Sequence, residues 1–215
     1  MAEAISKREA NKIDKRRRII AAASASFAKL GYERTTLRQV AVAAGVGVGT
    51  LFLYAKTKED LLVMVFQKEI RSIIDEAVGT LPGGSTISRI CYVCAAVTAH
   101  HQLKRELGAV FLKELAFVSK EYRGDVIRFI SDWKASIARI IEEGQVRGEV
   151  RGDVDANLLA GLALDIFTSE LRRWAADPLA EVNVGNYMPV AMEVLLTCGG
   201  PRVPEHSAAP AERTL

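Results

Sequence analysis

The stretch from Thr35 to Leu62 limits the possible folds more than any other part of this chain. Thr36 is followed three residues later by Gln39, a pair that forms a capping box at the start of a helix. Gly45 then predicts the end of that helix, because glycine adopts the positive φ that helix ends often need. A second short helix is expected over residues 48–54.

A second capping box, formed by Thr57 and Asp60, predicts that a long helix follows at once. Two short helices joined by a glycine-containing turn form a helix-turn-helix, whose second helix lies in the major groove of DNA. Thr50 and Tyr54 would offer hydroxyls to phosphates or bases, and Gly49 would let the backbone approach closely. Val48 or Leu51 would touch a thymine methyl group. The alternative is a pair of surface helices in an ordinary helical domain. The candidate DNA contacts are Thr36, Arg38, Gln39, Gly47, Val48, Gly49, Thr50, Leu51, Phe52, Tyr54, Lys56 and Lys58.

The pattern T-x-x-x-V-A-x-x-A-G-V-x-x-G-T-L-F-x-Y-x-x-T-K-E-x-L resembles the DNA-binding signature of the tetracycline-repressor (TetR) family, within Arg16 to Leu62. The resemblance implies a dimeric, all-helical, ligand-responsive transcription regulator, usually a repressor. The residues that carry the match are Thr36, Val40, Ala41, Ala44, Gly45, Val46, Gly49, Thr50, Leu51, Tyr54, Lys58, Glu59 and Leu61.

Three positions depart from the family pattern. Gly47 stands where a small hydroxyl residue is common, and Phe52 stands where tyrosine is common, so two phosphate hydrogen bonds are absent. Ala55 replaces a phenylalanine that would anchor the second helix. These departures bear on DNA affinity and operator identity more than on the fold.

The charge of the chain is unevenly distributed. Residues 1–58 contain 12 Lys+Arg and 4 Asp+Glu, a net +8, and the remaining residues contain 17 and 22, a net −5, which together give the chain's +3. A basic head on an acidic body is expected when only the head meets phosphate, although a solvated basic surface would look the same. Lys7, Arg8, Lys12 and residues 15–18 form a basic arm that would follow the DNA backbone, enter the minor groove, or remain a solvated tail.

Helical periodicity continues through the rest of the chain, and strand-like alternation is absent, so we expect an all-α fold with about nine helices. We expect an N-terminal arm and helix-turn-helix domain over residues 1–57, a ligand-binding and dimerisation domain over 58–200, and a disordered tail over 201–215. The expected helices span residues 15–30, 37–44, 48–54, 58–78, 85–102, 104–119, 122–146, 156–175 and 184–198. Asp155 is expected to cap the helix over 156–175, and Ile130 is expected in the core-facing stripe of the helix over 122–146.

The helix over 58–78 starts at the DNA-binding end and finishes inside the body, so it is the natural lever between the two. The last two helices, over 156–175 and 184–198, are apolar, and the first of them is apolar on more than one face. A helix that is apolar on two faces must bury both, so these helices predict a four-helix interface in a homodimer. A two-fold dimer would also double the base contacts, across a palindromic operator.

The resemblance further implies a ligand cavity in the body, and a largely apolar pocket would suit it. The candidate ligand, a small apolar or aromatic effector, would meet Cys94, Thr98, His101, Phe111, Glu114, Phe129, Trp133 and Phe167. Most of these residues would equally serve as plain core. Glu114 lies on an apolar stripe and needs a partner, which is solvent, an arginine such as Arg139, or the ligand. Cys91 and Cys94 form a C-x-x-C, better explained as core than as a redox or zinc site.

Two other classes of protein are disfavoured. An all-α enzyme would need a catalytic constellation, and G-x-S-x-G, H-E-x-x-H, P-loop and G-x-G-x-x-G motifs are all absent. A protein that coats DNA without sequence preference would spread positive charge over its body. The sequence predicts no metal and no cofactor. A polar N-terminus and the lack of a long apolar run predict a cytoplasmic protein with reduced thiols and no membrane partner.

Overall fold

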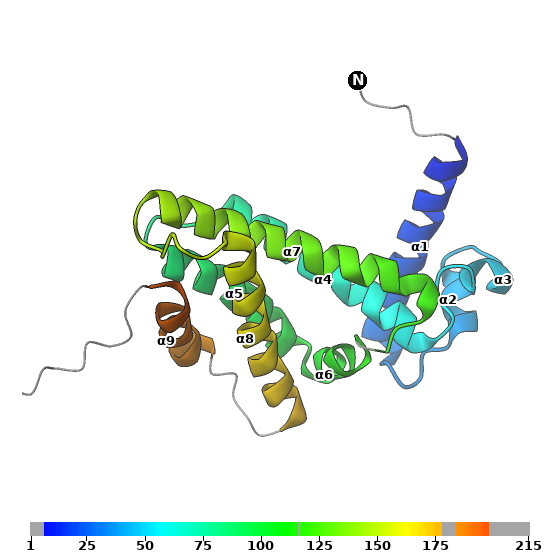
Figure 1. Cartoon of the computed structure of the whole chain (residues 1–215). Helices are drawn as coiled ribbons and strands as arrows, with labels where there is room; N and C mark the ends of the chain where they lie inside the picture. The colour runs from blue at the N-terminus through cyan, green and yellow to red at the C-terminus, as the bar shows by residue number, and fades with distance from the viewer. Residues whose placement is uncertain (1–6, 116, 178–183, 198–215) are drawn as a thin grey trace, which may run out of the picture.

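A computed structural model describes residues 7–115, 117–177 and 184–197, and in these ranges the chain is helical throughout, with no strand. Three helices form a small head and six form an elongated body (Figure 1). The nine helices of these ranges are α1 (Lys7–Leu30), α2 (Leu37–Ala43), α3 (Val48–Leu51), α4 (Lys58–Gly79), α5 (Thr86–Leu103), α6 (Arg105–Glu114), α7 (Lys120–Val146), α8 (Ala156–Ala176) and α9 (Val184–Leu196).

The head folds around the inner face of α1. Ile19, Ala23 and Phe27 are buried there at helical spacing, together with Val40 and Ala41 of α2. The predicted capping box of α2 is present, with the side chain of Thr36 accepting from the backbone N–H of Gln39. Gly45 has φ +62°, a left-handed conformation in which other residues are strained, and this turn directs α3 away from α2.

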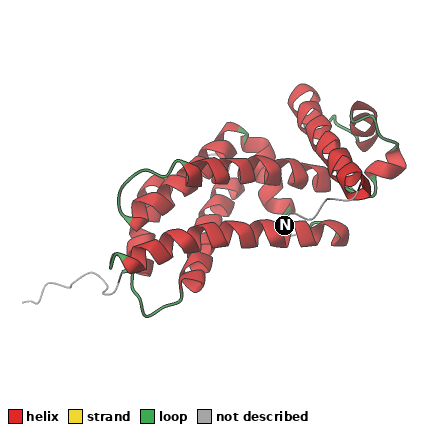
Figure 2. Ribbon diagram, turned by 90° about the horizontal axis from the view of Figure 1, so that it is seen from above, coloured by secondary structure: helices red, strands yellow, loops and turns green. Residues whose placement is uncertain are grey.

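Helix α4 joins the head to the body. Its predicted capping box is formed, because Thr57 accepts from the N–H of Asp60 and Asp60 accepts from the N–H of Thr57. Every residue from Asp60 to Gln67 is buried, so the first turns of α4 are covered on all sides. The head packs on this part of α4 through α1, and the body packs on it through α5, α6 and α7. Figure 2 shows α1 crossing the end of the body at a steep angle.

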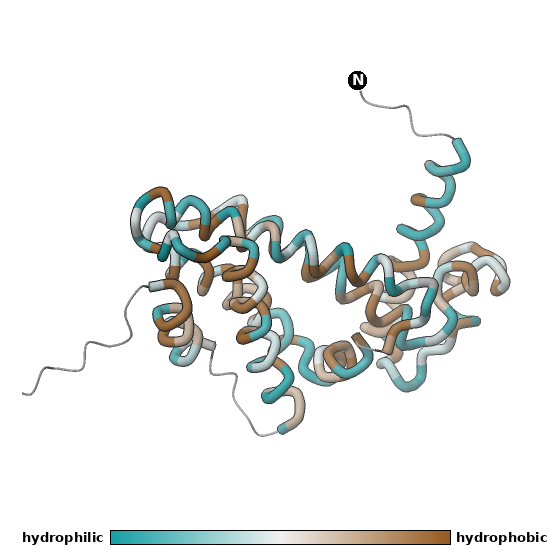
Figure 3. The backbone as a smooth tube through the Cα atoms, viewed as in Figure 1, coloured by the Kyte–Doolittle hydropathy of each residue, from teal (hydrophilic) through white to brown (hydrophobic). Residues whose placement is uncertain are grey.

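The body is a bundle in which α7 packs on α8 and α5 packs on α9, with α4 against α5 and α7. Figure 3 shows apolar residues on the inner faces of these helices and hydrophilic residues along the free end of α1. The predicted N-cap of α8 is confirmed, since Asp155 accepts from the N–H of Leu158. The core residue Phe167 on α8 has no exposed surface.

Several predicted boundaries were wrong, and each has a local cause. Helix α1 begins at Lys7, so the predicted basic arm is helical from that residue onward. The ion pairs of Asp14 with Arg17 and with Arg18, three and four residues apart, stabilise this charged segment as helix. Helix α3 ends at Leu51, because the next residues form three-residue turns with i→i+3 hydrogen bonds.

Helix α6 ends at Glu114 rather than at Ser119, because the chain must turn there into α7. The backbone N–H of Ser119 donates to Oδ1 of Asp60, which fixes this turn on the start of α4. Ile130, expected in the core-facing stripe of α7, is 45 % exposed. The predicted tail over 201–215, residues 1–6 of the predicted arm and the end of the last predicted helix lie outside the described residues.

Within the described ranges, none of the helices combines the length and apolar character needed to cross a membrane.

Candidate nucleic-acid interface and effector groove

The head presents α2, α3 and the turn after α3 on its free side, away from the body (Figure 1). Among the residues expected to meet DNA, Arg38, Gly47, Val48, Gly49 and Lys56 are exposed. A Cβ built on Gly49 would meet nothing within 4 Å, so this position leaves open space where a duplex could approach. The predicted arrangement of a helix-turn-helix with an open second helix is therefore present.

The predicted contact of Leu51 with DNA was wrong. The side chain was expected to touch a thymine methyl, but its exposed fraction is 0 % and it lies in the core of the head. A side chain buried under the helix cannot reach a base, so Leu51 holds α3 on the core while its neighbours face outward.

Other predicted contact residues already have partners within the head. Gln39 and Thr36 are exposed, but both side chains take part in the capping box. The hydroxyl of Tyr54 donates to the carbonyl oxygen of Lys12, 3.3 Å away. The ammonium of Lys58 donates to the carbonyl oxygen of Glu33 and lies 4.3 Å from the ring centre of Tyr32. Contacts from these residues to DNA stay a prediction.

Two residues that the sequence analysis missed belong to the same face. Val42 of α2 and Leu53 after α3 are 75 % and 76 % exposed, although both are apolar. Half-exposed Thr50 and exposed Phe52 lie beside Leu53 in sequence. Two apolar side chains left in water next to a helix-turn-helix are candidates for contact with thymine methyl groups.

The head and the body are joined by side-chain contacts as well as by α4. Arg16 of α1 donates to Asp125 of α7 at 3.2 Å and to the hydroxyl of Tyr122 at 3.4 Å. That hydroxyl donates in turn to Oε1 of Gln67 on α4. Burial raises the pKa of Tyr122, so it keeps its proton and remains a donor. These contacts connect α1 to both α7 and α4.

Glu69 makes a second connection between head and body. The hydroxyl of Ser24 on α1 donates to Oε1 of Glu69, and the ammonium of Lys104, between α5 and α6, donates to both carboxylate oxygens at 2.8 Å. Nε2 of His100 lies 3.1 Å from Oε2 of Glu69. Burial raises the pKa of Glu69, but the contacts with His100 and Lys104 outweigh it and hold the pKa at about 2.

The predicted ligand residues fall into two aromatic clusters. His101 and Phe111 contact Phe66, with ring centres 6.0 and 5.1 Å from that of Phe66. Trp133 contacts Phe129 and Phe167 at 6.1 and 5.6 Å. Cys94 and Thr98 are also buried, and the hydroxyl of Thr98 donates to the carbonyl oxygen of Cys94. The structure thus packs these residues against one another, as core residues pack.

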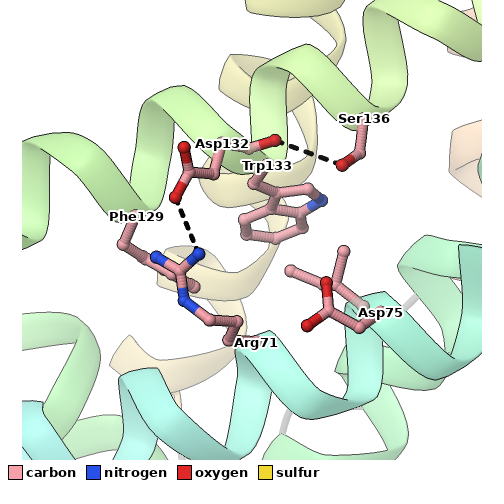
Figure 4. A pocket seen from close by; sticks show the side chains of 7 residues that line it. Arg71, Asp75, Phe129, Asp132, Trp133 and Ser136 are labelled. Carbon is pink, nitrogen blue, oxygen red and sulfur yellow. Dashed lines mark hydrogen bonds and ion pairs between the residues drawn. The ribbon is translucent and has the colours of Figure 1, made fainter. Parts of the chain in front are cut away.

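A groove between α4 and α7 opens next to the second cluster, and its lining includes two of the predicted ligand residues, Phe129 and Trp133. Arg71 of α4 closes its outer side by donating to Asp132 of α7 at 2.7 Å (Figure 4). A second, wider part of the groove lies along the same helices toward Arg16, with a volume of about 360 Å³ and open to solvent. Arg71 and Asp132 line both parts.

Two family models match the chain. The model "Bacterial regulatory proteins, tetR family" matches residues 19–65, which contain α2, α3 and the turn between them. The model "Tetracyclin repressor-like, C-terminal domain" matches residues 83–175, from the start of α5 to the end of α8. The chain belongs to the TetR family. It is therefore a helix-turn-helix transcriptional regulator with a DNA-binding head and a helical C-terminal domain.

Relatives with this organisation cover most of the chain. The HTH-type transcriptional regulator YhgD of Bacillus subtilis is 28 % identical over 75 % of this chain and 85 % of its own. The HTH-type transcriptional repressor KstR of Mycolicibacterium smegmatis is 26 % identical over 85 % and 87 %.

A solved structure of Thermus thermophilus FadR, a TetR-family repressor in complex with lauroyl-CoA, has a TM-score of 0.71 and 21 % identity, and covers 86 % of this chain and 97 % of that one. Bacillus subtilis FadR in complex with stearoyl-CoA has a TM-score of 0.64 and 22 % identity, and covers 84 % and 97 %. At these identities, the two structures establish the shared fold.

The three departures from the TetR signature have clear structural settings. Gly47 is the N-cap of α3 and provides no side-chain hydrogen bond there, which a hydroxyl residue would provide. Ala55 is 1 % exposed, so it occupies a core position under the second helix with a methyl group only. Phe52 is 36 % exposed at the end of α3. The second helix of this TetR-family head thus begins without a side-chain cap.

Glu114 and the cysteines also differ in setting from a ligand site. The carboxylate of Glu114 lies 3.5 Å from the ammonium of Lys113, its neighbour in sequence, and not near Arg139, whose side chain hydrogen-bonds within α7. Burial raises the pKa of both Cys91 and Cys94, which makes these thiols poor nucleophiles. Among the described residues, no cluster of three or more potential ligand side chains is placed to hold a metal ion.

Proposed function

We propose that this protein is a dimeric repressor that binds a palindromic operator and leaves it when an amphiphilic small molecule binds the body. The observation that carries the proposal is the open face of α2 and α3, with Arg38, Val42, Val48, Gly49 and Leu53 exposed, in a chain of the TetR family. Residues 1–57 would form the DNA-binding unit, and residues 58–200 the unit that binds the effector and the second copy.

The DNA contacts would come from the second helix and its flanks. Arg38 and Lys56 would meet phosphates, Thr50 and Tyr54 would meet phosphates or base edges, and Val48 would meet a thymine methyl group. The backbone at Gly49 would approach the duplex, because no side chain is present there. Binding to chromosomal DNA requires a cytoplasmic protein, which is part of the proposal.

The second copy would bind through α8 and α9. Leu158 and Leu162 lie four residues apart on α8 and remain exposed, and Tyr187, Val190 and Val194 form a stripe at helical spacing on α9. Monomeric soluble proteins rarely leave such neighbouring apolar stripes in water. An isologous four-helix contact would cover both stripes and set the spacing of the two heads.

For the effector, we favour a molecule with one apolar and one charged end. The wider part of the groove between α4 and α7 is lined by charged residues, and its narrow part, of about 20 Å³, is lined in part by the rings of Phe129 and Trp133. A long-chain acyl-CoA is the first candidate to test, because two FadR structures of the same fold hold such molecules. Binding would favour a head spacing that does not fit the operator.

The test is a footprint on the DNA upstream of the protein's own gene, with and without palmitoyl-CoA. Protection of two half-sites about one helical turn apart, or a multiple of it, is expected without ligand, and its loss is expected with ligand. Thr50→Ala combined with Tyr54→Phe should weaken operator binding roughly tenfold or more, since each lost hydrogen bond costs about 1 kcal/mol. Unchanged affinity and unchanged preference over scrambled DNA in this double variant would refute the proposed interface.

A further inference from the structure

The wider part of the groove, between α1, α4 and α7, gathers positive charge at the junction of head and body. Its lining includes four cations, from Arg16, Lys68, Arg71 and Arg128, and two carboxylates, from Asp125 and Asp132. Four minus two leaves an excess of two positive charges, and Asp75 at the inner end reduces it to one over the whole groove. Arg16 comes from the basic head, and the other five charged residues of the wider part come from the acidic body, apart from the DNA-binding face.

The carboxylates of the groove are already shared. Asp125 accepts from Arg16 at 3.2 Å and also from Arg128. Asp132 accepts from Arg71 at 2.7 Å. Lys68 is exposed and has no carboxylate partner in the part of the chain that the structure describes. The groove therefore has more donors than acceptors, which is the composition of an anion site.

A buried amide gives independent support. Gln67 lines the groove, is 5 % exposed, and uses its Oε1 as acceptor for Tyr122. Its Nε2 is buried and has no hydrogen-bond partner. A buried N–H group without an acceptor is unfavourable, and such groups in native proteins call for an explanation. An oxygen atom of a bound anion would satisfy this amide.

We propose that this groove binds the phosphate groups of the effector and that binding withdraws Arg16 from Asp125. The inference rests on the proposed function and specifies its effector as a phosphorylated amphiphile. Multiple phosphates match the excess of donors. Because Arg16 is on α1 and Asp125 is on α7, a phosphate that binds Arg16 breaks a contact between head and body.

The test measures binding of four probes to the full-length protein by calorimetry, below the micellar concentration of each lipid. The probes are palmitoyl-CoA, CoA, pyrophosphate and palmitate, which separate the phosphate groups from the acyl chain. Lys68→Gln combined with Arg71→Gln should weaken the binding of palmitoyl-CoA and of CoA roughly tenfold or more, because charge-assisted contacts are lost. The affinity for palmitate should stay unchanged. Arg139→Gln, an exposed arginine elsewhere on α7, is the matched control and should change nothing.

Asp125→Asn tests the competition for Arg16. Without the carboxylate, the phosphates no longer compete for the guanidinium, so CoA should bind severalfold more tightly. Unchanged CoA affinity in this variant, wild-type palmitoyl-CoA affinity in the Lys68/Arg71 double variant, or the failure of all three phosphorylated probes to bind would each overturn the inference.

Operator release is measured separately. If palmitoyl-CoA binds as expected but never releases the operator DNA, the inferred site stands and the proposed function fails. If palmitoyl-CoA releases DNA equally well from the wild type and from the Lys68/Arg71 double variant, the proposed function stands and the inferred site fails.

Discussion

At the scale of single residues, the head depends on the left-handed backbone conformation of one glycine, Gly45. Gly45 ends α2 at φ +62°, and the N–H groups of Gly45 and Val46 donate back to carbonyl oxygens of α2. This arrangement fixes the angle at which α3 leaves the turn. An L-residue with a Cβ pays for this conformation in strain, whatever space surrounds it.

Gly45→Ala should therefore lower the stability of the protein by about 1 kcal/mol. A Cβ at Gly45 would approach Nη1 of Arg18 at 3.6 Å, an ordinary contact, so the cost comes from backbone strain alone. Urea unfolding checks the prediction. Gly49→Ala is the matched control, because Gly49 lies in α3 without a positive φ and has open space around it. Alanine there should not lower stability and should raise it slightly, since alanine is the better helix former.

His101 makes stability depend on pH. Burial, with a smaller effect of His100, lowers its pKa from 6.5 to about 4, and its Nδ1 has no hydrogen-bond partner. Below pH 6.5, His101 is protonated in the unfolded chain, whereas in the folded protein it stays neutral until the pH falls to about 4. The contribution of His101 is therefore complete above pH 6.5 and is lost as the pH falls toward 4.

Between pH 7 and pH 5 this loss should amount to about 2 kcal/mol of unfolding free energy. Urea unfolding of the wild type and His101→Gln at both pH values measures it. The variant should be less stable at pH 7, yet lose less stability on acidification than the wild type. Equal losses in the two proteins would show that His101 does not titrate in this range.

At the scale of elements, the start of α4 connects three parts of the molecule through one buried carboxylate. Oδ2 of Asp60 accepts from the N–H groups of Lys56 and Thr57, which closes the capping box. Oδ1 of Asp60 accepts from the N–H of Ser119, which starts α7. Asp60, in the first turn of α4, therefore also holds the loop that leads into α7.

Asp60→Ala should lower stability by roughly 2–4 kcal/mol, because it leaves three N–H groups without their acceptor. Thr57→Ala removes only the reciprocal half of the capping box and should cost about 1 kcal/mol. Thermal unfolding of both variants gives the comparison. A cost for Asp60→Ala no larger than that for Thr57→Ala would mean that the contact with Ser119 contributes nothing.

At the scale of the whole molecule, the exposed apolar stripes of α8 and α9 decide the state of assembly. Leu162 is 42 % exposed, Val190 is 64 % exposed, and α8 packs on α9. A charge introduced in the middle of a dimer interface would have to be buried without a partner, which is strongly unfavourable.

Leu162→Glu should convert the proposed dimer into a monomer and weaken operator binding by roughly a hundredfold or more, since one of two half-site contacts is lost. Analytical ultracentrifugation measures the assembly, and a DNA titration measures the affinity. Ile127→Glu, on α7 at 60 % exposure, is the control and should remain a dimer with normal affinity. A monomeric wild type, or a dimeric Leu162→Glu variant, would contradict the proposed interface.

The sequence by itself determined the local structure of the head and the helix starts. Thr36, Thr57 and Asp155 were predicted as caps and are caps, because a capping bond joins residues only three positions apart. The TetR resemblance in the same segment is confirmed by the family model over residues 19–65. The predicted DNA contacts stay a prediction except at Leu51, where helical spacing alone did not reveal the buried side.

Only the tertiary structure decided which distant residues meet. Arg16 is one of several cations in a run, and nothing near it in sequence shows that it contacts Asp125, on a helix formed more than a hundred positions later. The unpaired amide of Gln67 and the cations around it depend equally on how α1, α4 and α7 pack. Local hydrogen bonds form between residues that are a few positions apart in the chain, so the spacing of residue types in the sequence predicts them. A groove between helices forms from side chains that come together only when the whole bundle has folded.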